Sequence, residues 1–132
     1  VDYQNYVDRV MTTSLTLPPR ERIDLGVAHL EMGFFDVALG IFETVVRYEE
    51  FEKTGSYLLA LSLIRSGRAI EATLRLEPLV RDITMTESEK VDFLYLMGLA
   101  FETMSDLKKA KDFYRRVLVL NPKYRDVADK VK

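Results

Sequence analysis

The sequence contains no cysteine, no tryptophan and a single histidine in its 132 residues. Without cysteine, the chain can form neither a disulfide nor a thiolate site for catalysis or metal binding. One histidine does not by itself supply the ligand set that a zinc site needs. We therefore expect no disulfide, no bound metal and no cofactor.

Long apolar segments are also missing. The chain has no run of about 18 apolar residues and no charged-then-apolar leader, so the sequence predicts neither a membrane span nor a signal peptide. Its formal net charge of −2 is too near balance to attract nucleic acid or a membrane by bulk charge. The first residue is Val1 rather than Met, as expected of a domain cut from a longer protein. In that case a targeting signal could have been removed with the rest. With that reservation we expect a cytoplasmic protein.

The sequence does contain a pattern of small and apolar residues that occurs three times. The first copy has Leu25-Gly26, Gly33, Ala38 and Phe42; the second Leu59-Ala60, Gly67, Ala72 and Leu76; the third Met97-Gly98, Ser105, Ala110 and Tyr114. The copies occupy residues 19–52, 53–86 and 87–124, and the third includes an insert of about one helical turn at its start. Self-similarity at this spacing is typical of a stacked-repeat architecture.

Each copy has the pattern of two helices joined by a turn. We expect helices at about 20–32, 36–48, 54–66, 69–82, 87–104 and 106–120. Gly33 and Gly67 are predicted left-handed helix stops, and Asp36 a cap of the helix that follows it. Thr86 and Glu89 form a predicted capping box, whereas Pro78 predicts a kink inside the fourth helix.

Shorter amphipathic segments flank the repeats. Residues 2–11 place apolar side chains on one helical face (Tyr3, Tyr6, Val7, Val10 and Met11), and a linker follows to residue 18. This helix is too short to be stable alone, so we expect it to dock on the rest of the chain. Residues 125–132 continue a helical spacing that begins at Tyr124 and includes Val127 and Val131, which predicts a C-terminal capping helix.

The three copies resemble the tetratricopeptide repeat, whose pattern is W-x₂-L-G-x₂-Y…A-x₃-F…P. The third copy is the most similar, with Leu94, Met97-Gly98, Phe101, Ala110, Tyr114 and Pro122, while the leading Trp is absent from all three. The resemblance implies an all-α, right-handed α–α superhelix (solenoid) of three helix-turn-helix repeats with flanking helices. Small residues at two places in each copy let the paired helices approach closely.

In a tetratricopeptide stack the first helix of each repeat lines a concave surface. The resemblance places these residues there: Ile23, Val27, Leu30, Tyr57, Leu61, Ile64, Arg65, Tyr95, Leu99 and Glu102. Most are apolar, and an exposed apolar strip commonly marks an interaction site. The strip indicates a groove that holds an amphipathic helix or an extended peptide, with Tyr57 and Tyr95 as hot spots. The alternatives are that residues 3–11 or a second copy of the chain fill the groove.

These features predict a non-catalytic scaffold or adaptor module with a protein or peptide partner. The alternative is a tetratricopeptide-type secretion chaperone that holds segments of a translocated protein and dimerises through its N-terminal helix. Binding of heat-shock chaperone tails is not expected, because the places of the carboxylate clamp hold Ile23, Val27, Leu58, Asp92 and Leu96 instead of Lys, Asn and Arg.

Other candidate residues have ordinary structural explanations. His29 stands at an aromatic place of the repeat, which predicts a packed filler. The serines lack a nucleophile elbow and no Gly-rich phosphate loop is present, so we expect no enzyme. The C-terminal region is rich in basic residues: Lys108, Lys109, Lys111, Arg115, Arg116, Lys123 and Arg125. Such a cluster can bind an acidic partner or RNA, but it is more commonly the solvated face of a helix. Because no base-stacking platform accompanies it, we expect no nucleic-acid partner.

Overall fold

A computed structural model of the chain describes residues 2–132. Over this range it consists of eight α-helices, one 3₁₀ helix and connecting turns, with no strand. The chain forms two compact units that divide after Leu63, near the end of the fourth α-helix. The all-α architecture that the repeat pattern predicts is confirmed.

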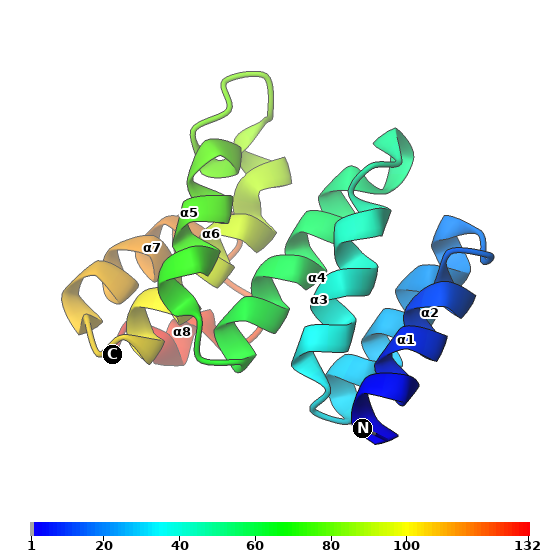
Figure 1. The fold of residues 1–132 in the computed structure, drawn as a ribbon. Helices are drawn as coiled ribbons and strands as arrows, with labels where there is room; N and C mark the ends of the chain where they lie inside the picture. Colours follow the sequence, from blue (N-terminus) through cyan, green and yellow to red (C-terminus); the bar gives the residue numbers. More distant parts are fainter. Residues whose placement is uncertain (1) are drawn as a thin grey trace. The chain divides into compact units, whose positions relative to one another are not determined.

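The first unit contains α1 (Asp2–Ser14), α2 (Pro19–Glu31), α3 (Phe35–Val45), the 3₁₀ helix η1 (Glu49–Phe51) and most of α4 (Glu52–Arg65) (Figure 1). Gly33 has φ +82° between α2 and α3, as predicted for a left-handed helix stop. The residue at the N-cap of α3 is Phe34, and Asp36 lies in the first turn without making a capping bond. The prediction of a cap at Asp36 is therefore wrong, although its charge there still suits the helix dipole.

Close contact between α2 and α3 depends on a glycine. A Cβ atom placed on Gly26 would lie 2.8 Å from Cζ of Phe42, whose ring is fully buried. Only glycine lets α2 approach the ring this closely, because real Cβ contacts are longer. The buried face of α3 supplies the core of this unit, with Val37, Ala38, Ile41, Phe42 and Val45.

The predicted N-terminal helix docks on its own chain. α1 packs against α3, and the Met11 methyl group lies 3.0 Å from the place of a Cβ on Gly40. The ring centroids of Tyr6 and Phe34 are 5.9 Å apart. After α1, the Arg22 guanidinium donates to the carbonyls of Leu15 and Leu17 at 3.1 and 2.8 Å. The segment before α2 is thus fixed to the first unit.

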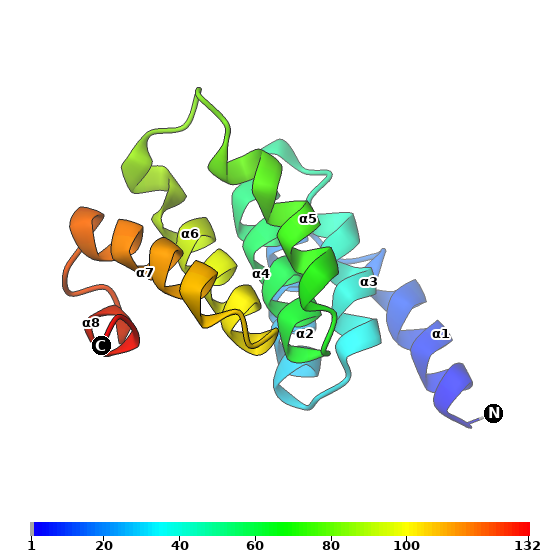
Figure 2. The ribbon, with the colours of Figure 1, turned by 90° about the vertical axis from the view of Figure 1, so that its left-hand side faces the viewer.

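The second unit contains α5 (Ala69–Val80), α6 (Glu87–Thr103), α7 (Leu107–Leu120) and the single-turn α8 (Val127–Lys130) (Figure 2). The predicted capping box is present at α6: the Thr86 hydroxyl accepts from the Glu89 N–H, and the Glu89 carboxylate accepts from the Thr86 N–H. α5 ends at Val80, two residues past Pro78 and earlier than predicted.

The second unit repeats the close contact of the first. A Cβ atom on Gly98 would lie 2.8 Å from Cζ of the buried Tyr114, just as one on Gly26 would lie 2.8 Å from Cζ of Phe42. Both glycines precede their aromatic partner by the same distance in sequence, so the hairpins α2–α3 and α6–α7 share this close contact at equivalent places. At the turn, however, Ser105 takes a left-handed conformation (φ +63°) where α2–α3 has glycine.

Candidate functional site

The predicted binding face keeps part of its apolar surface exposed in the first unit. Ile23 and Val27 on α2, and Tyr57 and Leu61 on α4, are partly buried. Leu30, predicted on the same face, is only 3% exposed and belongs to the core. Four apolar side chains from two helices therefore retain surface that a partner can contact.

α1 docks on another side of α2. The Tyr6 hydroxyl donates to Nε2 of His29 at 2.5 Å, and Nδ1–H of His29 donates to the Leu25 carbonyl at 2.8 Å. His29 is separated from Val27 and Ile23 by about 160° and 120° around the helix axis. The contact between Tyr6 and His29 therefore lies away from Ile23 and Val27, and His29 is a buried filler, as predicted.

In the second unit the residues predicted to line the binding face differ in their exposure. Ile64 is 7% exposed, whereas Arg65 is exposed and Leu99 is partly buried. Tyr95, predicted as a hot spot, is only 5% exposed. Its ring lies between those of Tyr114 and Tyr124, with centroid distances of 5.6 and 5.3 Å.

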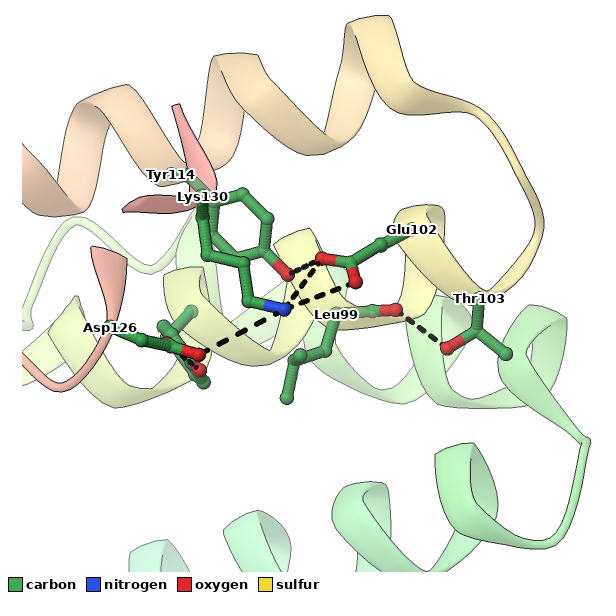
Figure 3. A network of polar contacts seen from close by, with 7 residues as sticks. Leu99, Glu102, Thr103, Tyr114, Asp126 and Lys130 are labelled. Carbon is green, nitrogen blue, oxygen red and sulfur yellow. Dashed lines mark hydrogen bonds and ion pairs between the residues drawn. The ribbon is translucent and has the colours of Figure 1, made fainter. Parts of the chain in front are cut away.

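The chain after α7 makes polar contacts with α6 around Tyr95. The Tyr95 hydroxyl donates to Asp126 at 2.5 Å, and the Tyr124 hydroxyl donates to Asp92. Figure 3 shows Lys130 between Glu102 and Asp126, with Nζ 3.0 Å from both Glu102 oxygens and 3.9 Å from the Asp126 carboxylate. The capping segment therefore covers part of the face on which Tyr95 and Glu102 lie.

Tyr114 joins this network from the core side. Its hydroxyl donates to Glu102 at 2.8 Å, and its ring is 1% exposed. Burial, followed by the hydrogen bond to the Glu102 carboxylate, raises the pKa of Tyr114 well above its usual range. The apolar spacing of the C-terminal segment was recognisable in the sequence. That spacing did not identify Asp126 and Lys130 as the residues that bind α6.

Residues 2–132, which the structure describes, contain neither a cluster of metal ligands nor a membrane-spanning helix. No cluster of three or more His, Asp or Glu side chains has the geometry of a metal site. No helix in this part of the chain is both long and apolar enough to cross a membrane.

The chain has the all-α helical-repeat fold of tetratricopeptide repeat domains. It is similar to the first such domain of Spaghetti (RPAP3), solved with the HSP90 peptide SRMEEVD, at 18% identity and a TM-score of 0.71 over 86% of each chain. It is also similar to the first such domain of human RPAP3, solved by NMR, at 18% identity and a TM-score of 0.72 over 86% of each chain. No protein-family model and no curated protein matches the sequence. At this identity the likeness shows the fold alone.

Proposed function

We propose that the chain is a non-catalytic protein-interaction module that binds a segment of another protein against α2 and α4. The observation that carries the proposal is the set of partly exposed apolar side chains on these helices: Ile23, Val27, Tyr57 and Leu61. The similar RPAP3 domain was solved with a bound peptide, which supports a peptide or a helix as the occupant.

Apolar anchors rather than a carboxylate clamp hold the proposed partner. The clamp places of this chain carry Ile23, Val27, Leu58, Asp92 and Leu96, which offer no cation to a C-terminal carboxylate. Asp92 would repel such a group. We therefore propose an apolar or amphipathic segment, held by burial of its side chains, and not an acidic chaperone tail.

The proposal depends mainly on the first unit. Tyr95 is 5% exposed beneath the chain's own C-terminal segment, so a partner reaches it only if that segment moves. Glu102 is paired with Lys130 but keeps 37% of its side chain exposed. Arg65, which is exposed, and Leu99, which is partly buried, belong to the second unit and stay predicted contacts. Among the anchors, Tyr57 is the expected hot spot, because aromatic residues with a polar tip dominate binding energy at interfaces.

The proposal is tested by quantitative affinity purification with wild type and the Tyr57→Ala/Leu61→Ala variant. A matched control, Ile83→Ala/Val119→Ala, removes apolar surface from residues that are 95% and 83% exposed elsewhere. We expect direct partners, confirmed by crosslinking to residue 57, to fall at least tenfold with the first variant and to persist with the control. Circular dichroism checks that both variants fold. Recovery of the same partners by both would contradict the proposed site.

A dimeric secretion chaperone is the alternative. The observation in its favour is apolar surface on and after α1, where Tyr3 is 51% and Leu15 is 59% exposed. Sedimentation equilibrium of the chain and of the Tyr3→Ser/Leu15→Ser variant distinguishes the two functions. The chaperone alternative predicts a dimer that the variant dissociates. A monomer in both cases favours the adaptor.

A further inference from the structure

A groove of about 540 Å³ lies in the second unit, where α5, α6 and α7 meet. It is lined by Glu77 and Val80 of α5, Arg81 at the C-cap of that helix, Met97 and Phe101 of α6, and Lys109, Asp112, Phe113 and Arg116 of α7. The rings of Phe101 and Phe113 are stacked, with centroids 5.7 Å apart and planes within 6°. A groove of this volume is large enough to receive side chains of a peptide.

This groove is distinct from the proposed peptide-binding face. Met97 and Phe101 are separated from Tyr95 and Leu99 by about 120° to 160° around the axis of α6. α6 packs against both α5 and α7, so its groove side lies between those two helices. Variants at one site therefore leave the side chains of the other in place.

The rim of the groove carries an excess of positive charge. α7 has five basic residues and one acidic residue, and two of the basic ones, Lys109 and Arg116, line the groove. The two carboxylates that line it already have cationic partners: Glu77 lies 2.9 Å from Arg81, and Asp112 lies 3.4 Å from Arg115. The charge at the rim is therefore complementary to an acidic ligand.

An exposed apolar strip extends the groove along α5. Ile70 and Leu74 are each 66% exposed, and helical spacing places them on the same face as Glu77 and Arg81. From residue 70 to residue 81 this face is about 16 Å long. Ile70 and Leu74 lie about 6 Å apart along the helix axis and add apolar surface that a partner can bury.

We propose that this groove is a second docking site, which binds an extended acidic peptide segment of another protein. One apolar or aromatic side chain of the peptide enters against Phe101 and Phe113, and its carboxylates pair with Lys109 and Arg116. RNA is disfavoured because each ring already contacts the other ring and a cation. The two rings stack on each other, Lys109 Nζ lies 5.4 Å from the Phe101 centroid, and Arg116 Cζ lies 5.8 Å from that of Phe113. A base that stacks on either ring would have to displace one of these cations.

The test is NMR titration of the ¹⁵N-labelled chain with three synthetic ten-residue peptides and with oligouridine. The first peptide has glutamates around a central phenylalanine, the second replaces that phenylalanine by alanine, and the third replaces the glutamates by lysines. The chain carries either the wild-type sequence, Lys109→Glu/Arg116→Glu, or the control Lys108→Glu/Lys123→Glu. The control changes the net charge equally at exposed residues that do not line the groove.

We expect the first peptide to shift the amides around Phe101, Lys109 and Phe113, and to bind at least tenfold more tightly than the other two. Lys109→Glu/Arg116→Glu should weaken this binding at least tenfold, and the control less than threefold. The proposal is overturned if the first peptide does not bind at millimolar concentration, if the two charge variants weaken it equally, or if oligouridine binds more tightly. None of these outcomes bears on the face formed by Ile23 and Tyr57.

Discussion

Replacing Gly98 by alanine tests the close contact between α6 and α7. The new Cβ would lie 2.6 Å from Cδ1 and 2.8 Å from Cζ of Tyr114, about 1 Å inside the optimal separation of two carbon atoms. The ring cannot readily move away, because it is 1% exposed, is packed against Tyr95 and is bonded through its hydroxyl to Glu102.

Two effects of opposite sign determine the change in stability. Alanine is favoured over glycine within a helix by about 1 kcal/mol. Overpacking a core costs about 1–3 kcal/mol, and a rigid aromatic ring places Gly98→Ala at the upper end of that range. We expect the free energy of unfolding to fall by about 2 kcal/mol, measured by urea titration with circular dichroism.

Gly40→Ala is the matched control. There the new Cβ would lie 3.0 Å from the end of the flexible Met11 side chain, which can move at little cost. This variant should be at least as stable as wild type. If Gly98→Ala were as stable as Gly40→Ala, the close contact would not exist.

A double-mutant cycle isolates the contact itself. The second copy of the sequence pattern has Ala60 and Leu76 at the equivalent places, so Gly98→Ala/Tyr114→Leu introduces the residue types of that copy. We expect a favourable coupling energy of about 1–2 kcal/mol between the two substitutions. Strictly additive losses would refute the steric explanation.

Three further predictions concern other parts of the structure. Ser105→Gly should raise the free energy of unfolding by about 0.5–1 kcal/mol, since φ is +63° there; a loss on thermal melting would contradict this. The raised pKa of Tyr114 makes stability fall above pH about 10, where only the unfolded state ionises this group. Urea titrations from pH 8 to 11 should therefore show a shallower fall for Tyr114→Phe, and equal slopes would exclude the effect. Val127→Ala should cost about 2 kcal/mol, because this side chain of α8 is fully buried, whereas the exposed Ala128→Ser should melt like wild type.

The helices and their ends were largely predictable because they depend on nearby residues. The capping box at Thr86 and Glu89 and the left-handed Gly33 and Gly67 need only a few neighbouring residues to form. The equivalence of Gly26 and Gly98 followed from their matched spacing to an aromatic residue. The predicted cap at Asp36 was wrong because Phe34 occupies the N-cap and the helix begins at Phe35. Local preference does not settle a helix start to within one or two residues.

The sequence by itself determined the helical hairpins, because small and large residues at fixed spacing specify how two neighbouring helices pack. Only the tertiary structure decided which apolar residues stay exposed. α6 is apolar on almost every side, so its periodicity does not say which side faces a partner. Tyr95 is covered by Tyr124, and Phe101 lines a groove with α5 and α7. The burial of Tyr95 and the exposure of Phe101 in a groove both depend on contacts between segments distant in sequence. A local sequence pattern does not contain that information.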